Sequence, residues 1–183
     1  MGKGRQLILA LLCSAALLAA SLGLGGRHVR AATTPQVGCP SGTLTVRRGQ
    51  SFYFTVVVSD VLDLYAWQTD VTYNTDYLDY EGIVIGDFLR RGGAAQATIE
   101  PTESPGLVDN VAVTRLSRHT GQDGSGTIAY LFFTALKDTG AGSTSAKVTH
   151  ALLLDRNALA IGKDYINSGY CRATIDHGAP PLV

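Results

Sequence analysis

Hydrophobic and polar positions alternate most regularly between residues 64 and 73 of the chain. Successive side chains of a β-strand point to opposite faces of a sheet, so an alternation with a period of two predicts a strand. The apolar face of this strand is rich in aromatic and β-branched residues, which suit a half-buried pleated surface. One face carries Tyr65, Trp67, Thr69, Val71 and Tyr73, and the other carries Leu64, Ala66, Gln68, Asp70 and Thr72.

Shorter runs of β-forming residues continue on both sides of this stretch, and Gly, Asn, Asp and Pro residues separate them. The sequence after residue 32 lacks the helical period of about 3.6 residues. Many short strands separated by turns are typical of an all-β sandwich or jelly roll. The predicted strands span residues 43–46, 51–58, 65–73, 78–85, 96–99, 107–116, 127–136, 146–154 and 170–175.

The same pattern gives expectations for the core, for the turns and for one unusual strand. Residues 127–136 are apolar on both faces, which predicts either cover on both sides or an aromatic contact surface. Residues 121–126 and 155–157 are predicted to form turns, because Gly, Asn and Asp favour turn conformations. The expected core contains Trp67, Val71, Tyr73, Leu78, Leu131 and Phe133.

The order of these motifs resembles that of cohesin modules. Residues 65–89, YAWQTDVTYNTDYLDYEGIVIGDFL, are similar to the alternating family strand that leads to a buried Leu, a second apolar strand and a Gly-Asp-Phe-Leu step. Residues 124–136, GSGTIAYLFFTAL, are similar to the family's glycine-rich turn and the strand after it. The resemblance covers about residues 42–175. It implies a cohesin-like, jelly-roll β-sandwich of about nine strands that captures dockerin modules, without catalysis, in polysaccharide-degrading assemblies.

The first 32 residues have the pattern of a secretory signal peptide. Lys3 and Arg5 precede an uncharged apolar run, and small residues follow at Ala31 and Ala32, after one of which cleavage is expected. The run approaches the ~20 residues of a membrane span, so an uncleaved anchor is the alternative. The expected organisation is a signal peptide at 1–32, a short N-terminal segment at 33–41, a cohesin-like β-sandwich domain at 42–176 and a C-terminal tail at 177–183.

Removal of the leader makes the chain acidic. The whole chain carries 15 basic and 15 acidic residues. The leader contains four of the basic residues and none of the acidic ones, which leaves 11 basic and 15 acidic residues and a net charge of −4. Nucleic-acid binding requires a concentrated basic face, and no basic run exceeds two residues. We therefore expect an extracellular or cell-surface protein with no nucleic-acid partner, and no membrane contact unless the leader is kept.

Two cysteines, Cys39 and Cys171, lie near the two ends of the chain that follows the leader. Exported proteins form disulfides, whereas a structural zinc site needs four ligands. A Cys39–Cys171 disulfide is therefore expected, and two free thiols are the alternative. The first and last strands lie side by side in the cohesin fold, which is compatible with a bridge between the two ends.

The sequence contains no convincing catalytic motif. His119, His150 and His177 are isolated, and no His-Glu-x-x-His pair is present. Glu100 and Glu103 could flank a glycosidic bond, but they lie in a proline-bounded segment that is expected to be a solvated loop. We expect no enzyme activity and no cofactor.

A surface calcium ion is the metal that the acidic loops come nearest to supporting. Calcium prefers several oxygen ligands, and Asp60, Asp63 and Asp123 lie in predicted loops. Residues 155–157 begin like a calcium-binding loop but run into apolar residues, so the chain is not itself a dockerin. Solvation of these loops is the favoured interpretation, and no metal site is assigned.

The family resemblance implies a protein-binding face on the strand at 65–73. In cohesins a dockerin helix docks onto one outer sheet face that includes this strand. If the apolar face of the strand points inward, its polar face points outward, where Gln68 and Asp70 can hydrogen-bond a dockerin-like module. An ordinary solvated sheet face is the alternative. The expected protein-binding residues are Ala66, Gln68, Asp70 and Thr72.

Two other functions stay open. Some carbohydrate-binding modules share this superfold and stack polysaccharide rings on exposed aromatic side chains, although most tyrosines of a sandwich fill its core or edges. A structural or adhesive building block of an extracellular protein is the other alternative. The sugar-stacking candidates are Tyr65, Tyr77, Tyr80 and Tyr130.

Overall fold

The computed structural model describes residues 34–40, 42–116, 120–163, 166–167 and 170–177. Within these ranges the chain forms thirteen strands and one short 3-10 helix, η1 (Phe88–Gly93). The predicted leader, its cleavage site, His119 and nearly all of the predicted tail lie outside the described residues. No helix within the described ranges has the length and hydropathy needed to cross a membrane.

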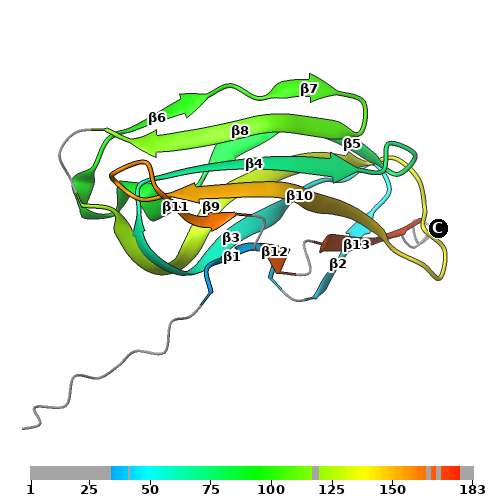
Figure 1. Cartoon of the computed structure of the whole chain (residues 1–183). Helices are drawn as coiled ribbons and strands as arrows, with labels where there is room; N and C mark the ends of the chain where they lie inside the picture. The colour runs from blue at the N-terminus through cyan, green and yellow to red at the C-terminus, as the bar shows by residue number, and fades with distance from the viewer. Residues whose placement is uncertain (1–33, 41, 117–119, 164–165, 168–169, 178–183) are drawn as a thin grey trace, which may run out of the picture. The chain divides into compact units, whose positions relative to one another are not determined.

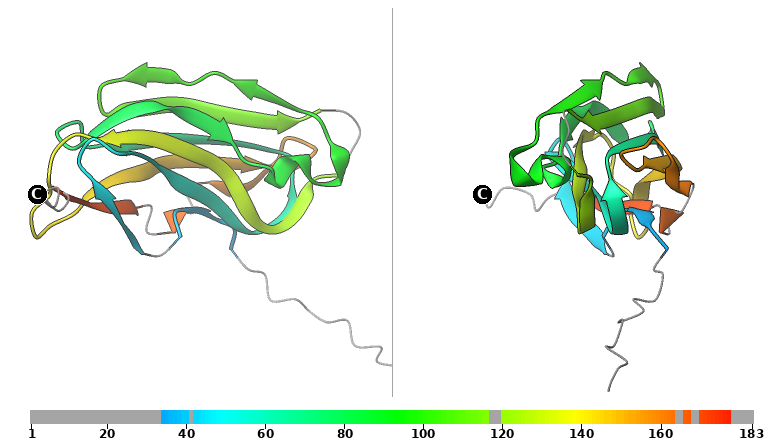
Figure 2. Two further views of the ribbon diagram at one scale, coloured as in Figure 1. Left: turned by 180° about the vertical axis from the view of Figure 1, so that it is seen from behind. Right: turned by 60° about the vertical axis from the view of Figure 1, so that its left-hand side comes forward.

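The strands form two sheets that pack face to face as a sandwich, which confirms the predicted fold class (Figure 1). Figure 2 shows the five-stranded sheet from behind and the two layers from one end. The strand order of the five-stranded sheet is β12 (Ile166–Asn167), β1 (Gln36–Gly38), β3 (Ser51–Leu64), β9 (Gln122–Ala135) and β5 (Leu78–Ile85). The order of the eight-stranded sheet is β2 (Thr43–Arg47), β13 (Tyr170–Asp176), β10 (Thr144–Leu154), β4 (Ala66–Tyr73), β8 (Leu107–Arg115) and β6 (Gln96–Ile99), with β11 (Ala160–Lys163) beside β10 and β7 (Thr102–Ser104) beside β8.

Strand β4 lies inside the eight-stranded sheet, between β8 and β10. Both neighbours run antiparallel to it, and Trp67 lies opposite Val113 of β8 and Leu153 of β10. All three side chains are buried. The side chains at positions 67, 69 and 71 are buried and those at 66, 68, 70 and 72 are half-buried. The alternation predicted from the sequence is therefore confirmed for positions 66–72. Leu64 was predicted on the outward face with Ala66, but it is the last residue of β3 and is fully buried.

The expected core is confirmed with one correction. Tyr73 is only half-buried, because β4 ends there and the chain turns at Asn74. Its ring still packs against the core, with its centroid 5.3 Å from that of Phe133 and 6.1 Å from that of Tyr80. The other expected core residues are at most 2% exposed: Trp67, Val71, Leu78, Leu131 and Phe133.

All nine predicted strands are present, and the described residues contain four further strands that were not predicted. These are β1, β7, β11 and β12, each two to four residues long and therefore too short to show an alternation. Strand β1 lies in the segment 33–41 that was expected to precede the domain. It pairs with β3 and with β12, so this segment takes part in the five-stranded sheet.

The predicted glycine-rich turn at 121–126 is wrong. Residues 122–126 belong to β9 and pair with the second half of β3. Gly126 is needed there for close packing rather than for a turn, because a Cβ atom at this position would overlap the ring of Phe88. A glycine in a strand often marks such a close approach.

The predicted loop after residue 58 is also wrong, because β3 continues to Leu64. Asp60 and Asp63 therefore lie within the strand, where the pairing register with β9 shifts. Both have a positive φ, 56° and 57°, which Asp tolerates better than most residues. These irregular positions carry polar residues typical of turns, and this is why the sequence pattern predicted a loop.

The expected disulfide between Cys39 and Cys171 is confirmed. Cys39 directly follows β1 of the five-stranded sheet, and Cys171 lies in β13 of the eight-stranded sheet, with 5.2 Å between the two Cα atoms. The bond closes a sequence separation of 132 residues. It therefore links the two sheets as well as the two ends of the domain.

We predict that Trp67→Ala lowers the free energy of unfolding by about 3–5 kcal/mol, because it removes a large side chain that is 2% exposed. Urea denaturation followed by circular dichroism measures this change. Leu62→Ala is the control, since Leu62 is 54% exposed and its truncation should change the stability little. A Trp67→Ala variant as stable as the control would contradict the assignment of Trp67 to the core.

Replacing both cysteines of the disulfide by serine is expected to destabilise the protein by about 2–5 kcal/mol, because the long loop is no longer closed in the unfolded chain. Denaturant unfolding of the oxidised protein and of the Cys39→Ser/Cys171→Ser variant measures the difference. Thiol titration of the unfolded, unreduced domain should detect neither Cys39 nor Cys171. Two reactive thiols would show that the bridge does not form.

Candidate recognition face

The outer face of the eight-stranded sheet carries the predicted protein-binding residues. Ala66, Gln68, Asp70 and Thr72 alternate with the buried residues of β4 and are half-buried on this face. Because β4 is flanked by β8 and β10, each of these positions has neighbours from both strands. We call this surface, formed by β6, β8, β4 and β10 together with the adjoining strand β13, the outer face.

The end of the outer face near Ala66 is apolar. In register across the sheet, Ala66 lies opposite Leu154 of β10, and Gln68 lies opposite Leu152 of β10 and Ala112 of β8. These side chains line a shallow hollow of about 170 Å³. Ile99 of β6, which is 65% exposed, lines the same hollow. The sequence pattern of β4 alone could not place these aliphatic residues on the face, because they come from three other strands.

The centre of the outer face is a hydrogen-bonded polar cluster. Gln68 Nε2 donates to Asn110 Oδ1 at 2.7 Å, and the backbone N–H of Asn110 donates to Asp70 Oδ1 at 3.0 Å. Asn110 has a positive φ of 59° and lies where β8 slips by one residue against β4. Gln68 and Asp70 are therefore held in place by an irregularity of the neighbouring strand.

Two carboxylates and a histidine meet in this cluster. Asp109 of β8 neighbours Asp70, and His150 of β10 lies opposite Asp70 in the sheet register. The pKa of Asp109 is raised above its ordinary value, chiefly by partial removal of the carboxyl group from water. A hydrogen bond to Asp70 and the negative charge of Asp70 raise the pKa further. The backbone N–H of Asn110 and the nearby His150 act in the opposite direction. The sequence did not predict this cluster, because its members lie far apart along the chain. His150 was interpreted from the sequence as an isolated surface residue.

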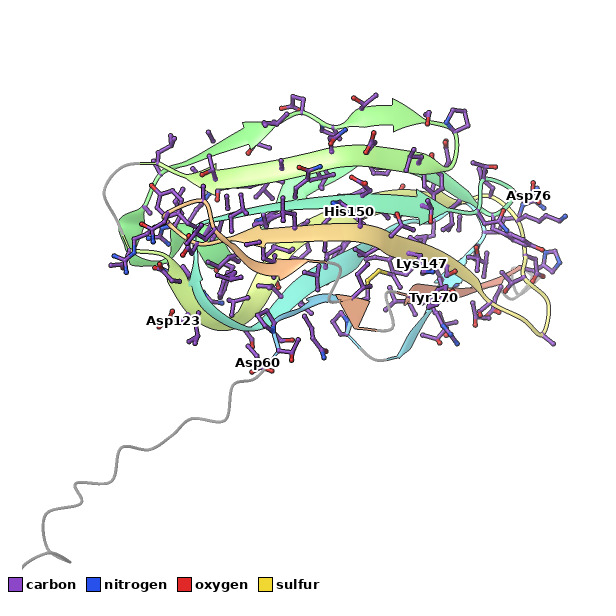
Figure 3. All side chains as sticks on the ribbon, in the orientation of Figure 1. Asp60, Asp76, Asp123, Lys147, His150 and Tyr170 are labelled. Atoms are coloured by element: carbon purple, nitrogen blue, oxygen red, sulfur yellow. A yellow bond between two sulfur atoms is a disulfide. The ribbon has the colours of Figure 1, made fainter. Side chains whose placement is uncertain are left out.

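The other end of the outer face is basic and aromatic. Lys147 Nζ lies 5.2 Å from the ring centroid of Tyr170, and Arg172 Cζ lies 5.4 Å from the same ring. Figure 3 shows Lys147 beside Tyr170 and places His150 further along the same face. Contacts between cations and an aromatic face at this distance are attractive. The outer face thus changes from apolar, through acidic and polar, to basic along β4 and β10.

The structure does not bring the four sugar-stacking candidates together. Tyr77 and Tyr80 pack against the core. The hydroxyl of Tyr80 is buried and has no hydrogen-bond partner among the described residues, and burial raises its pKa well above the ordinary range. Tyr65 is half-buried where β3 passes into β4, and its backbone N–H donates to Leu154 O at 2.8 Å. The fourth candidate, Tyr130, lies on the outward side of the five-stranded sheet.

Tyr130 belongs to a small aromatic patch with Tyr53 and Phe132, which were not among the predicted sugar-stacking residues. Its ring centroid is 5.4 Å from that of Tyr53, and the ring of Phe132 is 5.5 Å from Tyr53. Tyr53 is 49% exposed. For the apolar strand at 127–136 the sequence predicted either cover on both sides or an aromatic contact surface. The outward side of β9 forms an aromatic surface, which agrees with the second alternative.

Two of the three acidic residues considered for calcium, Asp63 and Asp123, use their carboxylates in structural contacts at the irregular end of β3. The carboxylate of Asp63 accepts a hydrogen bond from Gly121 N at 2.8 Å and pairs with Arg156 Nε at 2.9 Å. Asp123 Oδ1 accepts a bond from Asp63 N at 2.7 Å, and Asp60 N donates to Ser125 Oγ at 3.1 Å. The described part of the chain contains no group of three or more His, Cys, Asp or Glu residues placed to hold a metal ion. A surface calcium ion stays an untested expectation.

Comparisons with known proteins agree on one family. A family model described as the cohesin domain matches residues 40–171. No curated protein sequence matches the chain.

Several solved structures share the fold. The sixth cohesin of scaffoldin B from Acetivibrio cellulolyticus, solved with a mutant Cel5 dockerin, is 15% identical, with a TM-score of 0.60 over 79% of this chain and 100% of that one. A cohesin from Clostridium thermocellum, solved as the Coh-OlpA–Doc918 complex, is 13% identical, with a TM-score of 0.59 over 79% and 100% of the two chains. A non-cellulosomal cohesin from the archaeon Archaeoglobus fulgidus is 12% identical, with a TM-score of 0.53 over 77% and 91%.

The polar cluster predicts a measurable coupling between two carboxyl groups. The pKa of Asp109, followed by the NMR shift of its carboxyl carbon, should lie above its ordinary value and fall in Asp70→Asn, because that change removes the neighbouring negative charge. Asp76→Asn, in the exposed turn after β4, is the matched control and should leave the pKa unchanged. Equal pKa values in all three proteins would mean that the two carboxyl groups are not coupled.

Proposed function

The chain belongs to the cohesin domain family, and on this premise we propose that it is a secreted, non-catalytic module that recognises a dockerin-type protein module through the outer face. The observation that carries the proposal is the composition of that face, where an apolar hollow, an ordered polar centre and a basic end follow one another on one sheet. Cohesins that share the fold have been solved in complex with dockerins. Assembly of polysaccharide-degrading enzymes or of cell-surface proteins is the proposed context.

The size and shape of the outer face suit a helical partner. Four adjacent strands, β6, β8, β4 and β10, span roughly 14–19 Å at about 4.8 Å a strand. A helix with its side chains is about 10–12 Å across, so the face can hold at least one helix along its length. An amphipathic helix could place its apolar side chains in the hollow beside Leu152 and Ile99. Its polar side chains would then reach the centre of the face.

The charges of the outer face favour one orientation of such a helix. Asp70 and Asp109 make the centre acidic, and Lys147 and Arg172 make the far end basic. The positive N-terminal end of a helix, or a basic side chain on it, would be stabilised beside the two carboxylates. An acidic side chain of the partner would be stabilised beside Lys147.

The hydrogen bonds within the polar centre support a recognition role for Gln68 and Asp70. Because Asn110 holds both side chains, little rotamer entropy is lost when a partner binds them. Because of the same bonds, truncating either residue would also affect the irregular part of β8 at Asn110. A test of the face is therefore sharper at the exposed apolar end, where a substitution changes the surface alone.

Secretion is proposed from the leader pattern together with the disulfide. A signal peptide at 1–32 would carry the domain to an oxidising compartment, where a disulfide between Cys39 and Cys171 is stable. Within the described residues, the disulfide is the feature that supports secretion.

Carbohydrate binding is kept as a second candidate because of the aromatic patch on the other sheet. Tyr53 is exposed and touches Tyr130, but their rings are nearly perpendicular, at 86°. A flat sugar platform needs rings that present coplanar faces, which this pair does not offer. A structural or adhesive building block would engage neither dockerins nor sugars.

The proposal predicts that an arginine introduced on the outer face weakens dockerin binding, whereas an arginine introduced on the five-stranded sheet leaves it unchanged. Ile99→Arg, in the apolar hollow, should weaken dockerin binding at least about tenfold, because a charged side chain would have to be buried in the interface. Val84→Arg is the matched control, since Val84 is also an exposed aliphatic strand residue, 53% against 65%, but lies on the five-stranded sheet. The melting temperatures of both variants should stay within a few degrees of the parent.

Titration calorimetry against a panel of dockerins and against soluble cello- and xylo-oligosaccharides measures the binding. Equal losses in the two variants, or a loss only in Val84→Arg, would place the site elsewhere. Saturable sugar binding without any dockerin response would assign a carbohydrate-binding module. No response to either panel would leave the structural or adhesive role.

A further inference from the structure

A second concave surface lies away from the outer face, between β2 and the first half of β3. This groove has a volume of about 660 Å³, within the range of pockets that bind ligands. One wall is formed by residues 43–46 of β2, and the other is formed by residues 51–55 of β3 with Gln50 just before them. The disulfide between Cys39 and Cys171 also lines it.

Both walls of the groove are strand edges that have no paired neighbour on the groove side within the described part of the chain. Strand β2 pairs with β13 and is the last strand of its sheet. Strand β3 pairs with β9 along most of its length, but β1 covers only Val57–Ser59 on its other side. The chain leaves the five-stranded sheet after Gly38 and enters the other sheet as β2, so residues 51–56 of β3 have a paired strand on one side only among the described residues.

The backbone of β3 presents hydrogen-bonding groups to this groove. Ala135 N donates to Gln50 O at 3.1 Å, so the carbonyl of Gln50 points toward β9. In an antiparallel ladder, successive residues turn their N–H and C=O groups to alternate sides. Ser51, Tyr53 and Thr55 therefore turn theirs away from β9 and toward the groove. Unpaired edge groups of this kind are a template for another strand.

The groove also has features that select the side chains of such a strand. Phe52, Phe54 and Val46 form an apolar floor and are 3–9% exposed. An extended segment places alternate side chains on the same face, so every second side chain would lie on this floor. Among the described residues no acidic side chain lines the groove, Arg172 lines one wall, and Arg47 and Arg48 lie just beyond its Gln50 end.

We propose that this groove binds an extended segment of a partner protein as an added strand on residues 51–55 of β3. The segment carries apolar side chains at alternate positions and a carboxylate at the end that lies beside Arg47 and Arg48. The five residues offer about 17 Å of edge, which is the length of a typical short strand. This surface is separate from the outer face, so the inference goes beyond the proposed dockerin recognition and does not depend on it.

Two other occupants fit the groove less well. A second copy of the chain would have to insert one of its own edge strands, such as β2 or β5, and each of these is already attached to a neighbour, so a whole sheet edge would need to enter. A sugar would need a free aromatic face, but the ring of Tyr53 packs against Tyr130 and Phe132 on the outward side of the sheet. A single extended peptide matches both the unpaired backbone and the apolar floor.

Synthetic peptides test the proposal on the isotope-labelled secreted protein by NMR. Two six-residue probes of alternating Val and Thr carry Asp at the first or at the last position, which distinguishes parallel from antiparallel addition. We expect one probe to shift the amide signals of Tyr53 and Thr55 and to slow their hydrogen exchange. The same probe N-methylated at alternate residues should bind at least about tenfold more weakly, because each methyl group removes a donor of the added ladder. Replacing its Asp by Lys should weaken binding about two- to fivefold.

Two substitutions at one position separate backbone from side-chain recognition. Tyr53→Ala keeps the N–H that faces the groove and should bind the probe within about threefold of the parent. Tyr53→Pro removes that N–H without touching the ladder to β9 and should bind at least about tenfold more weakly. The N-methylated probe gives the same information on the unchanged protein if the proline variant does not fold.

Four results would overturn the proposal. The first is that neither probe shifts the two amide signals, and the second is that binding is lost in Tyr53→Ala. The third is that soluble cello-oligosaccharides produce the same shifts. The fourth is that the shifts arise when the protein alone is concentrated and dimerises. Dockerin titrations on the same sample report on the outer face separately, so a failure here leaves the proposed function untouched.

Discussion

The burial of one side of β4 is the constraint on which the rest of the structure depends. Trp67, Thr69 and Val71 are buried against the opposite sheet, while β8 and β10 hydrogen-bond to the two edges of the strand. A slip of one residue would move Trp67 to the surface and polar side chains into the core, so the register is strongly specified. That register in turn decides which residues of β8 and β10 meet Gln68 and Asp70 on the outer face. Core packing and the composition of the candidate site are thus consequences of the same alternation.

The fold could be predicted from the sequence where the pattern is local and long. The nine predicted strands follow from runs of β-forming residues between turn residues, and the buried side of β4 follows from alternation. The disulfide follows from the number of cysteines and the leader pattern. The prediction failed where polar residues sit inside strands. Asp60 and Asp63 in β3 and the glycines at the start of β9 have the composition of turns, but contacts between distant parts of the chain hold them in a ladder. Such contacts override local preference and leave no periodic pattern.

The candidate site could be predicted only along the strand that carries it. Alternation placed Gln68 and Asp70 on the outward side of β4, but their partners depend on the pairing of strands far apart in the sequence. Asn110 is 40 residues from Asp70 and reaches it only because β8 slips by one position against β4. His150 and the aliphatic residues of the hollow likewise join the face through β10, β8 and β6. The groove beside β3 is a further case, since an unpaired edge is a property of the sheet order and not of any one segment.

Methyl NMR of the domain with a saturating dockerin tests the central claim most directly, because it reports on both sheets of the unchanged protein at once. The outer face has methyl probes in Ile99, Leu152 and Leu154, and the opposite sheet has one in Val84. The account predicts that the signals of Ile99, Leu152 and Leu154 shift when the dockerin binds and that the signals of Val84 do not. Shifts confined to Val84 and its neighbours on the five-stranded sheet would contradict it.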